Sequence, residues 1–320
     1  MLSSKDVREL VSLARQHISL TESVIEKDYY VTQVIHELSN IENEYFNLVF
    51  CGGTCLAKAH KLVRRMSEDV DFKIQFKGDS LNFTKSRILK ELKEFRVYIK
   101  SKLMLTGLVI NEPVVRNEGQ YSRIEIEYPT IFQPSVRLRQ NILLEFTISE
   151  IRLSIESLSI ETLIEEVLKN IVISPKLKTV CISVVETAIE KWVGLTRRIM
   201  AIERGYHHDD KTLIRHVYDL NAIRQANKIS DDFFSLAKAI VNHDSMQFKN
   251  QHPEYFDDPR SEIMQSLAIL KSKPMWKERY QEFIETMVYD NRGALEYEEA
   301  MATLDLMSSK IINSLHLELV

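Results

Sequence analysis

The strictest constraint in this sequence is the segment DVDFKIQF, residues 69–76, in which polar and apolar residues alternate without a break. Successive side chains of a β-strand point to opposite faces, so this pattern predicts a strand with one buried face. The polar face begins with Asp69 and Asp71, whose α-carbons lie about 7 Å apart in an extended strand. Two carboxylates this close repel each other unless a cation lies between them. Oxygen ligands of this kind favour a hard cation such as Mg²⁺ or Mn²⁺.

A glycine turn comes shortly before this strand. The apolar run Phe46 to Cys51 predicts a buried strand, Gly52-Gly53-Thr54 follows it, and residues 54–65 predict a helix with four basic side chains. Glycines let backbone N–H groups approach a phosphate closely, and a helix N-terminus adds partial positive charge. Either feature alone is more often a plain turn or a solvated strand face. Together they suit phosphoryl or nucleotidyl transfer.

The rest of the chain divides into a mixed half and a helical half. Ser19 and Glu22 suggest a capping box before a helix over residues 21–39, and a second helix carries Ile88, Leu92, Phe95, Ile99 and Leu103 on its apolar stripe. Strands are expected near residues 108–115, 122–128 and 141–149. From about residue 159 the pattern is helical, apart from an apolar stretch near Val180. We therefore expect an α+β protein with an α/β lobe over residues 1–158 and a mainly helical lobe over 159–320.

Composition excludes several classes of protein. Lys plus Arg total 42 and Asp plus Glu 46, so a globally basic nucleic-acid binder is not indicated. Residues 58–102 nevertheless hold 13 basic against 6 acidic side chains, which suggests a polyanion near the first half. The three cysteines include no Cys-x-x-Cys and predict small buried side chains in a reducing compartment. No segment is apolar enough to span a membrane, so we expect a cytoplasmic protein.

Two polar segments outside the glycine turn are rival sites. GYHHDDK contains His207, His208, Asp209 and Asp210, but adjacent residues cannot easily converge on one ion, so a polar loop between helices is expected. HPEYFDDP, residues 252–259, is expected to be a packed loop with a helix start, and partner recognition there stays open.

The order strand, Gly-Gly-Thr, helix and Asp-x-Asp strand resembles the polymerase-beta-like nucleotidyltransferases. This resemblance implies their fold, a mixed sheet with flanking helices, and a third metal-binding carboxylate from a later strand. Glu145 is the candidate, as a lone charge within the apolar segment NILLEFTIS. A carboxylate in such a strand is costly unless it is paired or metal-bound. The alternative is an edge-strand residue that faces water.

Four segments in order resemble the AbiEii/AbiGii toxin family of nucleotidyltransferases. This family comprises the toxin halves of bacterial type IV toxin–antitoxin and phage-defence pairs. The four segments are VIEKDYYVTQVI, FCGGTCLAKAHKLVRRMSEDVDF, VETAIEKWVGLTRR and RHVYDLNAI. Together they are spread over most of the chain.

The resemblance also implies roles for single residues. Gly53 and Thr54, with the adjoining Gly52, would contact phosphates, and Asp69 and Asp71 would bind metal. Lys191 would pair with nucleotide phosphates, and Asp219 would position Lys191 or the substrate, so that the helical lobe completes the active-site cleft. The roles of three further residues stay open, namely Lys27, Asp28 and His216.

The implied activity is a metal-dependent transfer of a nucleoside monophosphate from an NTP to RNA, notably the 3′ end of tRNA. Such a modification would block translation, and a cognate antitoxin would counter it. The basic segment 58–102 is consistent with an RNA backbone. Two alternatives stay open: nucleotidylation of a protein such as the antitoxin, and a nucleotide-binding module without turnover.

Overall fold

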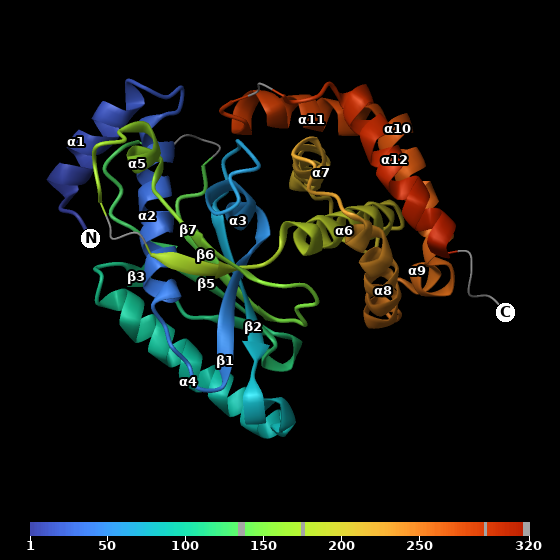
Figure 1. Ribbon diagram of the computed structural model, residues 1–320, viewed down its shortest axis with the longest axis horizontal. Coiled ribbons are helices and arrows are strands. Elements are labelled where there is room, and N and C mark those ends of the chain that lie inside the picture. The colour runs from blue at the N-terminus through green and yellow to red at the C-terminus, as the bar shows by residue number, and fades with distance from the viewer. Residues whose placement is uncertain (134–137, 174–176, 291–292, 316–320) are drawn as a thin grey trace. The chain divides into compact units, whose positions relative to one another are not determined.

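The computed structural model describes residues 1–133, 138–173, 177–290 and 293–315. The chain forms two compact units, one from Met1–Lys61 and Met66–Ser183 and the other from Leu62–Arg65 and Val184–Val320. The first unit contains the β-sheet, and the second is built from helices (Figure 1).

The first unit alternates between helices and strands. Its elements in chain order are α1 (Ser4–Arg15), α2 (Glu22–Ser39), β1 (Phe46–Cys51), α3 (Gly52–Lys58), β2 (Asp69–Phe76), η1 (Gly78–Asn82), α4 (Lys85–Met104), β3 (Val109–Ile110), β4 (Val114–Arg116), η2 (Asn117–Gly119), β5 (Tyr121–Glu127), β6 (Ile142–Ile148), β7 (Glu156–Ser159), α5 (Leu163–Val167) and β8 (Lys178–Cys181).

A mixed sheet organises the first unit. Within the described ranges it has eight strands in the order β3-β5-β6-β2-β1-β8-β7, and β4 pairs with β5. Strand β2 lies at the centre, parallel to β6 and antiparallel to β1. The predicted α+β class, with a mixed sheet and flanking helices, is therefore confirmed.

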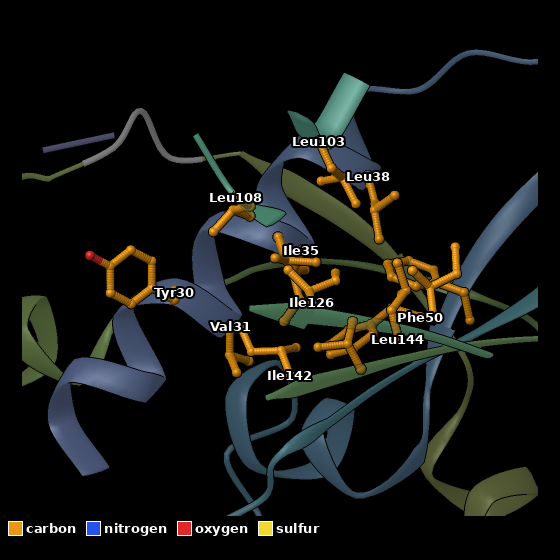
Figure 2. Packing of buried hydrophobic residues seen from close by; sticks show 14 of the residues in the cluster. Tyr30, Val31, Ile35, Leu38, Phe50, Leu103, Leu108, Ile126, Ile142 and Leu144 are labelled. Carbon is orange, nitrogen blue, oxygen red and sulfur yellow. The ribbon is translucent and has the colours of Figure 1, made fainter. Parts of the chain in front are cut away.

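The core covers one face of this sheet. Val70, Phe72 and Ile74 alternate along β2, and each is at most 3% exposed. Figure 2 shows apolar side chains of α2 and α4 packed over neighbouring strands, namely Val31, Ile35, Leu38 and Leu103 against Ile126, Ile142 and Leu144. Because the apolar positions of β2 point into this core, its alternate positions lie on the opposite face.

Three local predictions differ from the structure. Helix α2 begins as expected but has Thr21 as its N-cap, with no side-chain cap, so the capping box at Ser19 is absent. The strand expected over residues 108–115 is split into β3 and β4, and the break includes Pro113, which has no N–H to donate. The helix expected over 54–65 ends at Lys58, and Lys61 has a left-handed φ of +54°.

The chain around residues 62–65 explains why that helix ends early. These residues belong to the second unit, where Arg64 O accepts from Tyr289 N at 3.1 Å and Arg65 forms an isolated β-bridge with Val288. The backbone here is extended because its hydrogen bonds go to distant residues instead of to a helical turn.

The second unit is helical from residue 184 onward. Its elements are α6 (Val184–Glu203), η3 (Lys211–Ile214), α7 (Arg215–Gln225), α8 (Asp231–Phe248), α9 (Pro253–Asp257), α10 (Pro259–Ser272), α11 (Pro274–Met287) and α12 (Tyr297–Ser314). Helix α6 packs against α7, α8 and α10. The two tryptophans of the sequence, Trp192 and Trp276, are both fully buried in this unit. None of the described helices is both long and apolar enough to cross a membrane.

The helical pattern was expected from about residue 159, and the structure places its start later. Strands β7 and β8 pair with each other, and β8 runs parallel to β1. The segment up to Ser183 therefore belongs to the sheet unit. These strands have four residues each, too few for a clear alternation.

Candidate active site

Three carboxylates lie on one face of the two central strands β2 and β6. Asp71 stands directly beside Glu145 in the parallel register, and Asp69 stands beside Leu143. Asp69 and Asp71 are two positions apart, so they project to the same face as Glu145. Neighbouring strands are about 4.8 Å apart, which brings the carboxylates of Asp71 and Glu145 close together.

Glu145 is held within the sheet. Its strand lies between β5 and β2, so the alternative of an edge-strand residue is wrong. Tyr121 donates its hydroxyl hydrogen to Glu145 Oε1 at 2.8 Å. Burial raises the pKa of Glu145 and the charge of Asp69 raises it further, whereas the Tyr121 hydrogen bond opposes the shift.

Gly52 makes room for the Asp71 carboxylate. Its φ is +76°, in the left-handed region that favours glycine, and a Cβ added to it would lie 2.1 Å from Asp71 Oδ2. No real side chain fits at that distance. Gly52 is therefore favoured for two reasons: its left-handed backbone conformation and the space that the Asp71 carboxylate occupies.

Thr54 organises the beginning of the acidic strand. It is 1% exposed, its hydroxyl donates to Asp69 O, and Ser67 Oγ lies 2.9 Å from the same hydroxyl oxygen. Since that hydroxyl is already engaged, a phosphate contact from Thr54 would come from its backbone N–H. Phosphate binding by Gly52, Gly53 and Thr54 stays a prediction.

Arg139 is a member of this site that the sequence analysis missed. Its Nη1 lies 2.7 Å from Asp69 Oδ1, and its N–H donates to Glu68 Oε2 at 2.9 Å. Nothing in the local sequence singles it out, because it lies in an irregular segment before β6. Tyr121 was missed for a similar reason, since its partner Glu145 is 24 residues away.

The donor set fits a hard divalent cation in its chemistry. It consists of carboxylates from adjacent strands, and Asp71 lies in a space that any Cβ at Gly52 would fill. In the part of the chain that the structure describes, no three His, Cys, Asp or Glu side chains converge closely enough to hold an ion. Metal binding by Asp69, Asp71 and Glu145 stays a prediction.

A second cluster lies within the helical unit and is centred on Asp219 of α7. Arg65 contacts it through two nitrogens, Nε to Oδ1 at 2.7 Å and Nη2 to Oδ2 at 2.8 Å. Lys191 Nζ of α6 lies 2.8 Å from the same Oδ2. Asp219 is fully buried, and Arg65 and Lys191 are 3% and 9% exposed. The structure thus brings Lys191 and Asp219 together, and it adds Arg65, which was expected on a helix.

The charges of this second cluster shift the pKa values of its members. Burial would raise the pKa of Asp219, but the charges of Arg65 and Lys191 outweigh it and hold the pKa well below its usual range. Burial lowers the pKa of Lys191, which Asp219 partly offsets. Burial and the Lys191 charge lower the pKa of His216 well below its usual value, so this imidazole is neutral.

The two residues left open on α2 make buried contacts within the first unit. Lys27 is fully buried and its Nζ lies 2.7 Å from Glu68 Oε2. Asp28 accepts from Lys58 Nζ at 2.5 Å and from Leu163 N at 2.7 Å. Lys27 thus connects α2 to segments that flank β2 and β6, and Asp28 connects α2 to α3 and α5.

The two rival polar segments are accounted for by packing. Asp209 pairs with both terminal nitrogens of Arg279, and Asp210 accepts from Thr212 N as the N-cap of η3. The predicted polar loop over residues 205–211 is confirmed. In the other segment, α9 and the start of α10 form as expected, and Tyr255 is fully buried.

A glycine turn beside an acidic strand, with a third carboxylate in register, is the arrangement of a nucleotidyltransferase. The model of the AbiEii nucleotidyl transferase toxin family, of type IV toxin–antitoxin systems, matches residues 42–303, and the chain belongs to this family. Among solved structures it is similar to MenT4, a nucleotidyltransferase toxin from Mycobacterium tuberculosis H37Rv, at 15% identity and a TM-score of 0.39. That similarity covers 92% of this chain and 98% of MenT4. No curated protein matches the sequence significantly.

The close approach of Gly52 and Asp71 gives a first prediction. Gly52→Ala should displace the Asp71 carboxylate and weaken NTP binding in the presence of Mg²⁺ at least about tenfold, by the loss of one charge-assisted contact. Gly78→Ala is the matched control, because Gly78 also has a positive φ, +54°, with no atom within 4 Å of an added Cβ. Calorimetric titration measures both variants. Equal NTP affinities for the two would contradict the account.

The buried charges of the helical unit give a second prediction. Asp219→Ala leaves Arg65 and Lys191 without their shared anion, so it should cost about 3–5 kcal/mol of unfolding free energy. Lys191→Met keeps the contact of Arg65 with Asp219 and should cost far less. Both tryptophans lie in this unit, so urea unfolding followed by tryptophan fluorescence reports on it alone. The account is wrong if Asp219→Ala stays within about 1 kcal/mol of the wild type.

Proposed function

We propose that this protein transfers a nucleoside monophosphate from an NTP to a hydroxyl of RNA, with the 3′ end of tRNA as the acceptor. Membership of the AbiEii family supports the nucleotidyl transfer. The observation that carries the proposal is the placement of Asp69, Asp71 and Glu145 on one face of two adjacent central strands. Modification of that RNA end would stop translation and growth, and a cognate antitoxin would counter it.

The carboxylates have a defined task in this reaction. Asp69, Asp71 and Glu145 would hold Mg²⁺ or Mn²⁺, which supplies positive charge to the triphosphate and lowers the pKa of the acceptor hydroxyl. The acceptor hydroxyl loses its proton to solvent and its oxygen attacks the α-phosphorus in line. The bond from that phosphorus to the oxygen shared with the β-phosphate breaks, and pyrophosphate leaves. Asp71 is held by its register on β2, and Gly52 leaves the space that its carboxylate occupies.

Lys191 is proposed to carry positive charge to the phosphates of the nucleotide. Lys191 Nζ lies 2.8 Å from Asp219 Oδ2, so this carboxylate fixes where the lysine charge lies. Arg65 fixes the Asp219 carboxylate through two hydrogen bonds, and the fixed carboxylate can in turn orient the Lys191 ammonium. An arginine at position 191 would replace this point charge poorly, because its planar fork has a different shape.

RNA would be bound by part of the basic segment 58–102. Lys58, Arg65 and Lys73 of that segment are buried, so they are not available to a polyanion. Exposed basic side chains of the segment lie on α4, at Lys85, Arg87, Lys90 and Lys93, and the first three pair with Glu118, Glu91 and Glu94. Helix α4 packs on the sheet face opposite the three carboxylates, so it would contact a part of the RNA distant from the reacting 3′ end. Such contacts to a phosphate backbone would make RNA binding strongly salt-dependent.

The proposed function is tested by the Asp71→Asn variant. This change removes one negative charge with almost no change in shape, so RNA labelling from an α-labelled NTP should fall at least about 100-fold. Asp79→Asn is the matched control, because Asp79 is exposed in η1 of the same unit. Release of labelled pyrophosphate gives an independent measure. Wild-type rates in a folded Asp71→Asn protein would overturn the proposal.

A further inference from the structure

Arg139 contacts the acidic site through a half-exposed side chain and a single ion-pair contact. Its guanidinium reaches Asp69 through one nitrogen, Nη1, at 2.7 Å from Oδ1. The Arg139 side chain is 53% exposed and that of Asp69 is 27% exposed. By contrast, Arg65 binds Asp219 through two nitrogens, and its side chain is 2% exposed. The contact of Arg139 with Asp69 is therefore weak enough to be exchanged.

The backbone of Arg139 is fixed at both ends of the residue. Its N–H donates to Glu68 Oε2 at 2.9 Å, and its carbonyl accepts from Lys27 Nζ. Lys27 also donates to Asn141 O at 3.1 Å. A fully buried lysine is costly, and here it serves to hold the segment 139–141 beside Asp69. The structure thus combines a fixed backbone with a half-exposed guanidinium.

The charges of a divalent cation and an NTP would act on the Arg139 guanidinium in opposite directions. A divalent cation at Asp69 would repel Arg139 and compete with it for the same carboxylate oxygen. The triphosphate of an NTP brings several negative oxygens, and a guanidinium can bind two phosphate oxygens at once. The guanidinium end can move while its backbone stays in place, because it is held by a single exposed contact.

We propose that Arg139 is a nucleotide-binding residue, which pairs with Asp69 and moves to the triphosphate when a divalent cation takes its place. Lys27 and Glu68 are positioning residues, which hold the backbone of Arg139 at the required distance. This inference rests on the proposed function, since it needs Asp69 to bind a metal ion and the protein to bind an NTP.

Two titrations of the full chain test the proposal. The first measures Mn²⁺ binding without nucleotide by the electron paramagnetic resonance signal of free Mn²⁺. Arg139→Gln should bind Mn²⁺ about threefold more tightly, because the competing ion pair is lost. The second measures binding of non-hydrolysable analogues of the four NTPs at saturating Mn²⁺. Arg139→Gln should bind the preferred analogue at least about tenfold more weakly, since a charged contact to phosphate is lost. A residue with only a structural role would not change the affinities for Mn²⁺ and for the nucleotide in opposite directions.

A matched control and a conservative variant complete the test. Arg152→Gln removes an arginine that pairs with Glu150 on the same unit and should change neither affinity. Arg139→Lys keeps the charge without the fork and should recover Mn²⁺ affinity of the wild type but only part of the nucleotide affinity.

The proposal is overturned if folded Arg139→Gln, checked by its thermal unfolding, shows unchanged affinities or a loss of both. If the wild type binds neither Mn²⁺ nor any analogue, the proposed function itself is contradicted, and the role of Arg139 with it. If the wild type binds both ligands and only the variant fails to show opposite changes, the proposed function stands and the inference about Arg139 is wrong.

Discussion

The parallel pairing of β2 with β6 imposes the main physical constraint on the first unit, because it sets Asp71 beside Glu145 at the centre of the sheet. Like charges on adjacent strands destabilise a sheet unless they are compensated. The surroundings answer this constraint in different ways. Tyr121 donates to Glu145, and Arg139 pairs with Asp69. Gly52 leaves open the space into which the Asp71 carboxylate turns. Both compensating side chains come from segments that are distant in sequence from β2.

The helical unit buries its charges in a different way. Asp219 is fully buried; Arg65 contacts it through two nitrogens, and Lys191 Nζ lies 2.8 Å from its Oδ2. Loss of this carboxylate would leave two buried cations without their shared anion, so the cluster is expected to matter for stability. In sequence, three residues separate Arg65 of this cluster from Asp69 of the acidic strand.

Local sequence patterns predicted the strands of the site, but they did not predict side-chain contacts between residues far apart in the chain. Strands β1 and β2 form over the expected residues because their apolar and alternating patterns are complete within a few residues. Glu145 was identifiable because a lone charge in an apolar strand is costly. Arg65 was wrongly predicted on a helix, because its partner Asp219 lies 154 residues later and no local pattern indicates that contact. No sequence pattern indicates Arg139, because its contact with Asp69 depends on Glu68 and Lys27, which hold its backbone in place.

The central claim is that the acidic face of β2 and β6 transfers nucleotides to RNA, and one measurement tests it most directly. Purified protein is incubated with total RNA and each of the four α-labelled NTPs in Mg²⁺, and the products are divided and treated with nuclease or protease. The account predicts label on RNA of tRNA size that nuclease removes and protease does not. Label that only protease removes, or NTP binding without release of pyrophosphate, would contradict it.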